Sequence, residues 1–97
     1  MRLAHAKRRD ANEKEIVDGL RRMGISVMYT DQVDLICGWR GQNWLFEIKD
    51  ASKLYNADGI TYRKGAIKES QSKLMSTWQG NYAIITSIDE ALKEMGI

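Results

Sequence analysis

The sequence predicts a mixed α/β domain in which helices pack against a small sheet, in the order α-β-β-β-α-β with one further helix at the C-terminus. Three features support this class. Apolar residues recur at helical spacing near the N-terminus, strand-like segments with a glycine-containing turn follow, and another apolar segment stands between two helical patterns. Such an alternation is typical of helices layered on a sheet.

The first helix is expected over residues 10–23, as an amphipathic helix of about four turns. Gly24 is well placed to end it, because glycine readily adopts the backbone conformation found at helix C-termini. The inward face consists of apolar residues at helical spacing, which are Ile16, Val17, Leu20 and Met23.

Segments rich in β-branched, aromatic and apolar residues predict strands over residues 25–30, 33–39 and 44–49. The turn at residues 40–43, RGQN, contains the Gly and Asn typical of a hairpin, so the second strand should pair antiparallel with the third. Together these strands form a three-stranded meander.

Residues 50–65 are polar and interrupted by glycines, and we expect a long functional or flexible loop there. A second helix is expected over residues 66–78, after this loop. Its inner face would consist of Ile67, Leu74, Met75 and Trp78.

Residues 81–86, NYAIIT, are almost wholly apolar and predict a short strand that is buried on both faces. The last helix is expected over residues 88–96. Ser87 can cap this helix, since Glu90 stands three residues later, as in a capping box.

The chain has 97 residues, a length that supports one small core, and we expect a single domain over residues 1–97. A hydrophobic content of 43% with 29% charged residues is ordinary for a soluble protein, and no apolar run approaches the about 20 residues that span a bilayer. We therefore expect no membrane segment and no signal peptide. The lone Cys37 fits a small core residue in a reducing cytoplasm.

The net charge of +2 is too small to indicate a partner, but its distribution is uneven. Basic residues crowd the N-terminus and the segment 49–73, whereas the tail from Asp89 onward is acidic on balance. One face of the domain should therefore be more positive than another, which suits either solvated surface or a polyanionic partner.

The pattern FEIK places two charged side chains on one face of the third strand, because successive strand residues point to opposite sides. Glu47 and Lys49 share this face, while Trp44, Phe46 and Ile48 share the other. Taken alone, the pattern also describes a surface strand with an ion pair, which contributes at most about 1 kcal/mol.

Asp34 gives the pattern a chemical meaning. It lies near the start of the apolar strand 33–39, where a carboxylate close to the core is costly unless it has a partner or a metal. The hairpin brings this strand beside the one that carries Glu47. Two carboxylates on neighbouring strands, with Lys49 two residues further on, form a hard-oxygen site that suits Mg²⁺ or Mn²⁺, and the ammonium group can hold or activate a water.

Glu13 adds a third acid. It stands three residues before Ile16 and four before Val17, so it lies on the inward face of the first helix. Two interpretations stay open: an acid stabilised by the helix dipole at the N-terminus, or a carboxylate that reaches the metal site from across the sheet edge.

The residues Glu13 in NEKEIVDGLRRMG, Asp34 in VDLICG, and Glu47 with Lys49 in FEIKD resemble the signature of the PD-(D/E)XK nuclease superfamily. Within it the chain most resembles the VRR-Nuc group in its stand-alone phage and bacterial form, and is more distantly similar to archaeal Holliday-junction resolvases. The resemblance spans nearly the whole chain and implies a restriction-endonuclease-like core. Val33 stands where the motif has proline, a position at which many members differ.

The resemblance implies a structure-selective, Mg²⁺- or Mn²⁺-dependent endonuclease that hydrolyses DNA phosphodiesters, with a Holliday or similar branched junction as substrate, in the cytoplasm of a bacterial or phage-infected cell. The implied metal ligands are Asp34, Glu47 and the main-chain carbonyl of Ile48. Glu13 is implied to help hold metal or water, and Lys49 to orient the attacking water or stabilise developing charge.

Gln71, on the second helix, stands where the VRR-Nuc group often carries a glutamine near the active site, and equally suits an exposed helix position. Tyr55 and Tyr62 either pack against sugars and bases or anchor the loop on the core. His5, near the N-terminus, is expected to be solvated. The expected phosphate contacts are Arg8, Arg9, Lys53, Arg63, Lys64, Lys68 and Lys73.

A two-fold homodimer is expected, since one small domain offers one DNA-binding face whereas a junction has two strands to cut. Trp39, Trp44 and Trp78 are expected in the core or at the dimer interface. The alternative function is a non-catalytic DNA-binding or assembly module that retains the nuclease fold. A nuclease directed at RNA is a third possibility, because no residue of the sequence distinguishes RNA from DNA by recognising a 2′-hydroxyl group.

Overall fold

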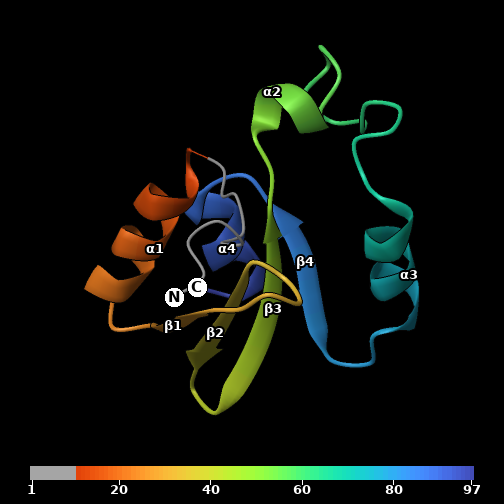
Figure 1. Cartoon of the computed structure of the whole chain (residues 1–97). Coiled ribbons are helices and arrows are strands. Elements are labelled where there is room, and N and C mark those ends of the chain that lie inside the picture. Colours follow the sequence, from red (N-terminus) through yellow and green to blue (C-terminus); the bar gives the residue numbers. More distant parts are fainter. Residues whose placement is uncertain (1–10) are drawn as a thin grey trace, which may run out of the picture.

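The computed structural model describes residues 11–97, and the predicted class, a mixed α/β fold with helices flanking a small sheet, is confirmed (Figure 1). Arg8, Arg9 and His5 lie outside the described residues. The elements are α1 (Glu13–Arg22), β1 (Ser26–Tyr29), β2 (Leu35–Trp39), β3 (Gln42–Ile48), α2 (Ala51–Leu54), α3 (Glu69–Thr77), β4 (Asn81–Ile85) and α4 (Ile88–Glu94).

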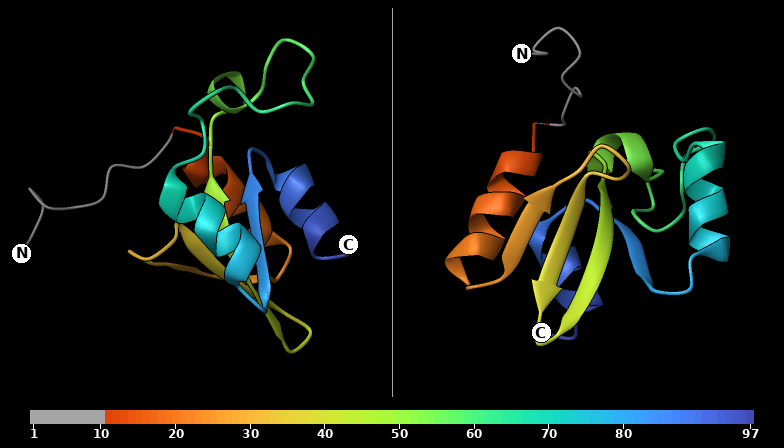
Figure 2. Two further views of the ribbon diagram at one scale, coloured as in Figure 1. Left: turned by 90° about the vertical axis from the view of Figure 1, so that its right-hand side faces the viewer. Right: turned by 60° about the horizontal axis from the view of Figure 1, so that its bottom comes forward.

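The four strands form one sheet in the order β1-β2-β3-β4. The first three make the predicted antiparallel meander, and β4 pairs parallel to β3. Helices α1 and α4 lie on one face, while α3 stands on the other side of β4 (Figure 2). The central strand β3 is therefore hydrogen-bonded on both sides, and its C-terminal end meets that of β4.

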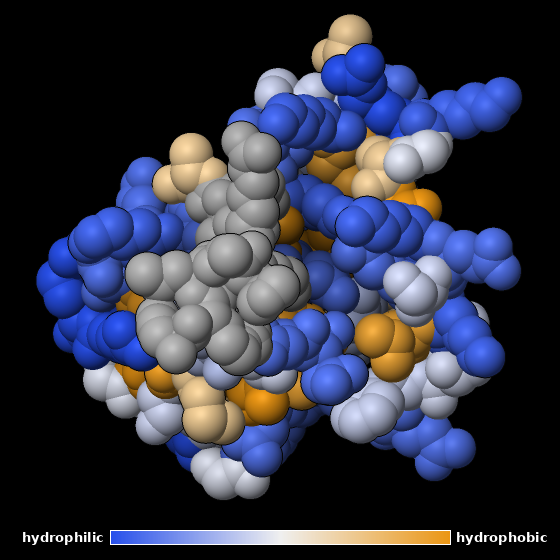
Figure 3. Space-filling model, viewed as in Figure 1, coloured by the Kyte–Doolittle hydropathy of each residue, from blue (hydrophilic) through white to orange (hydrophobic). Residues whose placement is uncertain are grey.

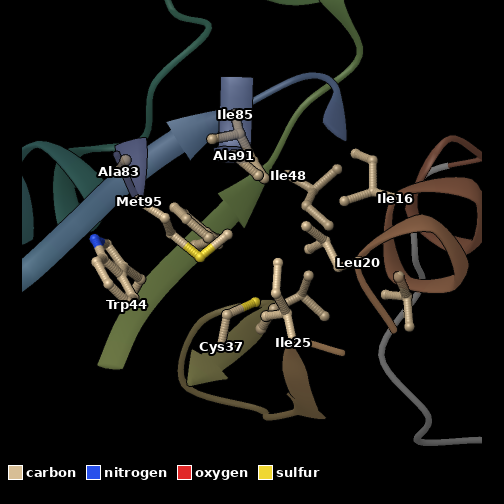
Figure 4. Close-up of a cluster of buried hydrophobic side chains, with 13 residues drawn as sticks. Ile16, Leu20, Ile25, Cys37, Trp44, Ile48, Ala83, Ile85, Ala91 and Met95 are labelled. Atoms are coloured by element: carbon tan, nitrogen blue, oxygen red, sulfur yellow. The ribbon is translucent and has the colours of Figure 1, made fainter. Parts of the chain in front are cut away.

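The core lies between the sheet and the two helices α1 and α4. Figure 4 shows Ile16 and Leu20 of α1 facing Ile48 of β3. Phe46 and Cys37 of the sheet are fully buried in the same cluster, so the prediction that Cys37 is a core residue is confirmed.

Gly24 ends α1 as expected, with a positive φ of 84°. Its N–H donates to the carbonyl of Arg21 at 3.0 Å, and the N–H of Ile25 donates to the carbonyl of Leu20 at 3.2 Å, so the last turn is closed by backbone bonds. The β2–β3 hairpin needs a turn of only two residues, Arg40 and Gly41, both with positive φ, so β3 begins at Gln42, earlier than predicted.

The segment 50–65, here called the arm, differs from the predicted loop because local hydrogen bonds give it structure. Asp50 caps α2: its Oδ1 accepts from the N–H of Ser52 at 2.9 Å and from its hydroxyl at 2.7 Å, which lowers the pKa of Asp50. An antiparallel bridge between Tyr55 and Tyr62 then closes the rest of the arm into a hairpin.

Two predicted burial patterns are wrong. No residue of α3 is buried, and its expected inner face leaves Met75 46% and Trp78 49% exposed, because the helix stands beside the edge strand β4 instead of over the sheet. Strand β4 is buried on one face only: Ala83 and Ile85 point into the core, while their neighbours are half-buried.

Among residues 11–97, no helix combines the length and the apolar character that crossing a bilayer requires. Ser87 caps α4 as predicted, with its hydroxyl accepting from the N–H of Glu90 at 3.2 Å. The carboxylate of Glu90 does not complete the capping box with Ser87; it accepts from the N–H of Thr86 at 2.6 Å instead.

Burial raises the pKa of the Cys37 thiol from 9.0 to about 11, which makes a testable stability prediction. The thiol of the unfolded chain ionises near pH 9.0 while that of the folded protein stays protonated until about pH 11, so this contribution to stability is complete below pH 9.0 and is lost as the pH rises to about 11. We expect the difference in unfolding free energy between the wild type and Cys37→Ala to shrink across this range in urea denaturation. A constant difference would contradict the buried, protonated thiol.

Candidate active site

Three acids lie inside the protein. Over residues 11–97, Glu13, Asp34 and Glu47 are the only buried charged side chains, with 3%, 9% and 6% of their surface exposed. Carboxylates are rarely buried without a specific role, because removing them from water is costly. The three acids that the sequence pattern singles out are therefore withdrawn from solvent.

Asp34 is held against β3 on both sides of Glu47. Its backbone N–H donates to the carbonyl of Phe46 at 3.1 Å, and its side-chain Oδ2 accepts from the N–H of Ile48 at 2.7 Å. Leu35, the next residue, pairs with Phe46 in the antiparallel register. These contacts place Asp34, which directly precedes β2, beside Glu47 of β3.

Tyr82 of β4 also belongs to this group, although no feature of the sequence pattern singled it out. It pairs with Leu45, so its side chain lies on the same face as Glu47. Burial chiefly, and then the negative charges of Glu47 and Asp34, raise the pKa of Tyr82. A side-chain interaction with Glu47 also raises this pKa, so Tyr82 is coupled to the acids through its buried hydroxyl.

Glu47 and Asp34 both act on Tyr82, so two buried carboxylates lie close to this position, and such a pair favours a cation. Mg²⁺ is usually held by one or two protein carboxylates, with water and substrate phosphate completing its coordination. Asp34 and Glu47 match this donor set. Within residues 11–97 no three His, Cys, Asp or Glu side chains gather into a metal-binding group, so Glu13 does not join them in one cluster.

Asn12 connects the start of α1 with the ends of the two parallel strands. Its Nδ2 donates to the carbonyl of Lys49 at 3.1 Å and to that of Thr86 at 2.9 Å. Glu13 is the next residue, so it lies at the same end of the sheet as Lys49. The Oδ1 of Asn12 is buried and accepts no hydrogen bond from the described residues. The sequence did not single out Asn12, because both of its contacts are distant in the chain.

Glu90 extends this connection to the arm. Its Oε1 accepts from the N–H and hydroxyl of Thr86 at 2.6 and 3.0 Å, and its Oε2 accepts from the hydroxyl of Tyr55 at 3.1 Å. Burial and this hydrogen bond raise the pKa of Tyr55. Tyr55 therefore anchors the arm on the body of the protein, which is one of the two roles expected from the sequence.

A hollow of about 450 Å³ lies where β3 passes into the arm, and we call it the basic hollow. Four cationic side chains and one acidic one contribute to its wall. Its lining residues are Lys49, Asp50, Lys53, Arg63, Lys64, Gly65 and Ala66. Hydrophilic residues dominate the visible surface of the arm and α3, with apolar residues showing between them (Figure 3).

The structure thus brings Lys53, Arg63 and Lys64 together with Lys49, whereas Lys68 and Lys73 belong to the start and body of α3 and do not line the basic hollow. Gln71 serves its own helix: its Oε1 accepts from the N–H of Lys68 at 3.1 Å. This contact gives the glutamine a local capping role, independent of any reaction.

Comparison of the chain with protein-family models, with curated proteins and with solved structures finds no match. The geometry and charge of the site are therefore the guide to its chemistry.

Replacing Asn12 tests whether the strand ends depend on it. Asn12→Ala removes two donors to part-buried carbonyls and should lower the free energy of unfolding by about 1–3 kcal/mol, and Asn12→Asp should cost more, because its carboxylate would face the same two carbonyls. Asn43→Ala, at an exposed position of β3, is the control. Urea denaturation would count against the assigned role if all three variants were equally stable.

Proposed function

We propose that this protein is a Mg²⁺- or Mn²⁺-dependent DNA endonuclease of the PD-(D/E)XK type, similar to the VRR-Nuc group and with a restriction-endonuclease-like core. The proposal rests on one observation above all: Asp34, directly before β2, and Glu47, near the end of β3, are both buried, and Lys49, just beyond the end of β3, lines the basic hollow. Carboxylates that could bind a metal ion are thus followed in the chain by cationic side chains that could bind a phosphate.

The chain's own groups have distinct parts in this proposal. Asp34 and Glu47, with the main-chain carbonyl of Ile48, would hold the metal ion, which supplies charge stabilisation and a water of lowered pKa. The hydrogen bond from the N–H of Ile48 to Asp34 Oδ2 keeps that carboxylate oriented against β3. Lys49 would orient the attacking water or stabilise the charge that develops on the phosphate.

Glu13 would assist from the start of α1, directly after Asn12, whose side chain is bonded to the carbonyl of Lys49. The basic hollow supports DNA as the substrate, because cationic side chains clustered on one side of the site neutralise phosphates and position the backbone. Lys68 and Lys73 on α3, and Arg8 and Arg9 in the N-terminal segment, would extend the contact.

A Holliday or other branched junction is the proposed substrate, cut by a two-fold homodimer in the cytoplasm of a bacterial or phage-infected cell. One active site per chain and two strands to cut favour two copies. The exposed Met75 of α3 and Trp78 directly after it support a surface for a second copy, since these large apolar side chains are otherwise left in water.

The second candidate is a DNA-binding or assembly module without catalysis, which the basic hollow alone would serve. It differs from the nuclease in one testable respect, because a module that only binds DNA does not need a divalent cation between β2 and β3.

The nuclease is tested with end-labelled four-way junctions and duplexes of matched sequence, with EDTA, Mg²⁺ or Mn²⁺. We expect cleavage only with a divalent metal, and faster cleavage of junctions. Lys49→Ala should slow cleavage by about 10²–10⁴-fold while leaving the fold intact. Lys93→Ala, at an exposed position of α4, is the matched control. Absence of cleavage of every DNA, or an unchanged rate for Lys49→Ala, would refute the proposed activity or mechanism respectively.

Titration calorimetry with Mn²⁺ separates the nuclease from the binding module. We expect one saturable binding event that is lost in Asp34→Asn and Glu47→Gln, since each change removes a charged oxygen ligand. Asp89→Asn, an exposed acid at the start of α4, should bind as the wild type does. Wild-type protein that binds DNA but not Mn²⁺ would favour the module.

A further inference from the structure

The tip of the arm presents an apolar side chain to solvent. Ile60 is 78% exposed, more than any other large hydrophobic residue among positions 11–97. Scattered exposed apolar residues are ordinary on protein surfaces. Ile60 differs from them in its setting, because it lies at the end of a rigid hairpin whose base carries the basic hollow.

Hydrogen bonds fix the backbone of the tip. Asp58 Oδ1 accepts from the N–H groups of Ile60 and Thr61 at 2.9 and 3.0 Å, and its Oδ2 accepts from the Thr61 hydroxyl at 2.8 Å. The N–H of Asn56 donates to the carbonyl of Thr61 at 2.8 Å, and its Nδ2 donates to the carbonyl of Tyr62 at 3.1 Å. Ile60 is therefore held in place before any partner arrives, which lowers the entropy lost on binding.

The hairpin is also fastened to the body of the protein. The rings of Tyr55 and Tyr62 stack with their centroids 5.7 Å apart, and the N–H of Arg63 donates to the carbonyl of the fully buried Leu54 at 2.7 Å. With the bond from Tyr55 to Glu90, these contacts make the arm a firm projection beyond the end of the sheet (Figures 1 and 2).

An apolar tip above a cationic base matches DNA in two respects. The basic hollow, lined by Lys53, Arg63 and Lys64, suits the phosphate backbone, and an isoleucine side chain suits the apolar faces of bases. Proteins that kink or open DNA commonly insert such a side chain between two base pairs. In fully paired DNA this insertion must break stacking, whereas at a branch point the stack is already interrupted.

We propose that Ile60 is a wedge that inserts at an opened base step of DNA whose backbone lies in the basic hollow. DNA with an interrupted stack, such as a junction, bulge or nick, is then preferred over continuous duplex. The proposal rests on DNA being the ligand, as in the proposed function, but binding can be measured without cleavage. A lipid surface is the less suitable partner, because one isoleucine buries little apolar area in a membrane.

The test uses the full chain in EDTA, with four-way junctions and duplexes of the same sequence that carry 2-aminopurine next to the branch point. Ile60→Ser should weaken junction binding by about tenfold, the size expected for one lost base contact, with little effect on duplex binding. With the wild type, we expect 2-aminopurine fluorescence to rise on binding because the base loses its stacking, and Ile60→Ser should abolish this rise. Ile60→Leu should retain both properties. Met28→Ser, which changes an apolar side chain of β1 that is 58% exposed, is the matched control.

Equal weakening for junction and duplex, or no weakening, would overturn the wedge. If Ile60→Ser weakened binding to vesicles with anionic lipids and left junction binding unchanged, the wedge would be overturned in favour of membrane insertion. The two proposals fail separately. Unstacking that depends on Ile60, without metal-dependent cleavage, would support the wedge and refute the nuclease. Metal-dependent cleavage with an unchanged junction preference in Ile60→Ser would support the nuclease and refute the wedge.

Discussion

The hydrogen bond from the backbone N–H of Ile48 to Asp34 Oδ2 is the contact on which the site depends. It holds a carboxylate against the central strand, where the neighbouring main-chain bond from Asp34 to Phe46 sets the start of β2. Leu35 and Phe46 can then enter the core from one face while Glu47 stays on the other. Because these residues alternate along two paired strands, the packing of the core and the position of the acids have one common cause.

The two faces of the sheet have different tasks as a result. Helices α1 and α4 cover the apolar face and supply the stabilising burial, which leaves the opposite face available for charge. The parallel pairing of β3 with β4 brings Tyr82 beside the acids and the strand ends beside α1. Asn12 and Glu90 then satisfy the main-chain groups at those ends, so the region that carries Lys49 is fixed from two helices at once.

Features that depend on local periodicity could be predicted from the sequence. Helical spacing predicted the inward-facing Glu13, which is buried, and strand alternation predicted that Trp44, Phe46 and Ile48 share the core face of β3. Asn12 and Tyr82 were missed, because their roles depend on which strand lies beside β3, a choice made by contacts distant in the chain. The structure of the arm was predictable in part, since the turn residues of NADG and the cap at Asp50 are local signals. The exposure of α3 could not be predicted, because an apolar pattern in the sequence does not show whether another element packs against that helix face.

The hairpin at the end of the arm begins and ends at nearly the same point. Tyr55 bridges Tyr62, and Leu54 is bonded to Arg63, so the intervening six residues, 56–61, form a closed unit outside the body of the protein. Changing the length or composition of such a unit alters few contacts of the core. Residues 56–61 can therefore vary in length and sequence without changes in the strands that carry the acids. Sequence libraries confined to these residues should leave the rest of the fold unaltered.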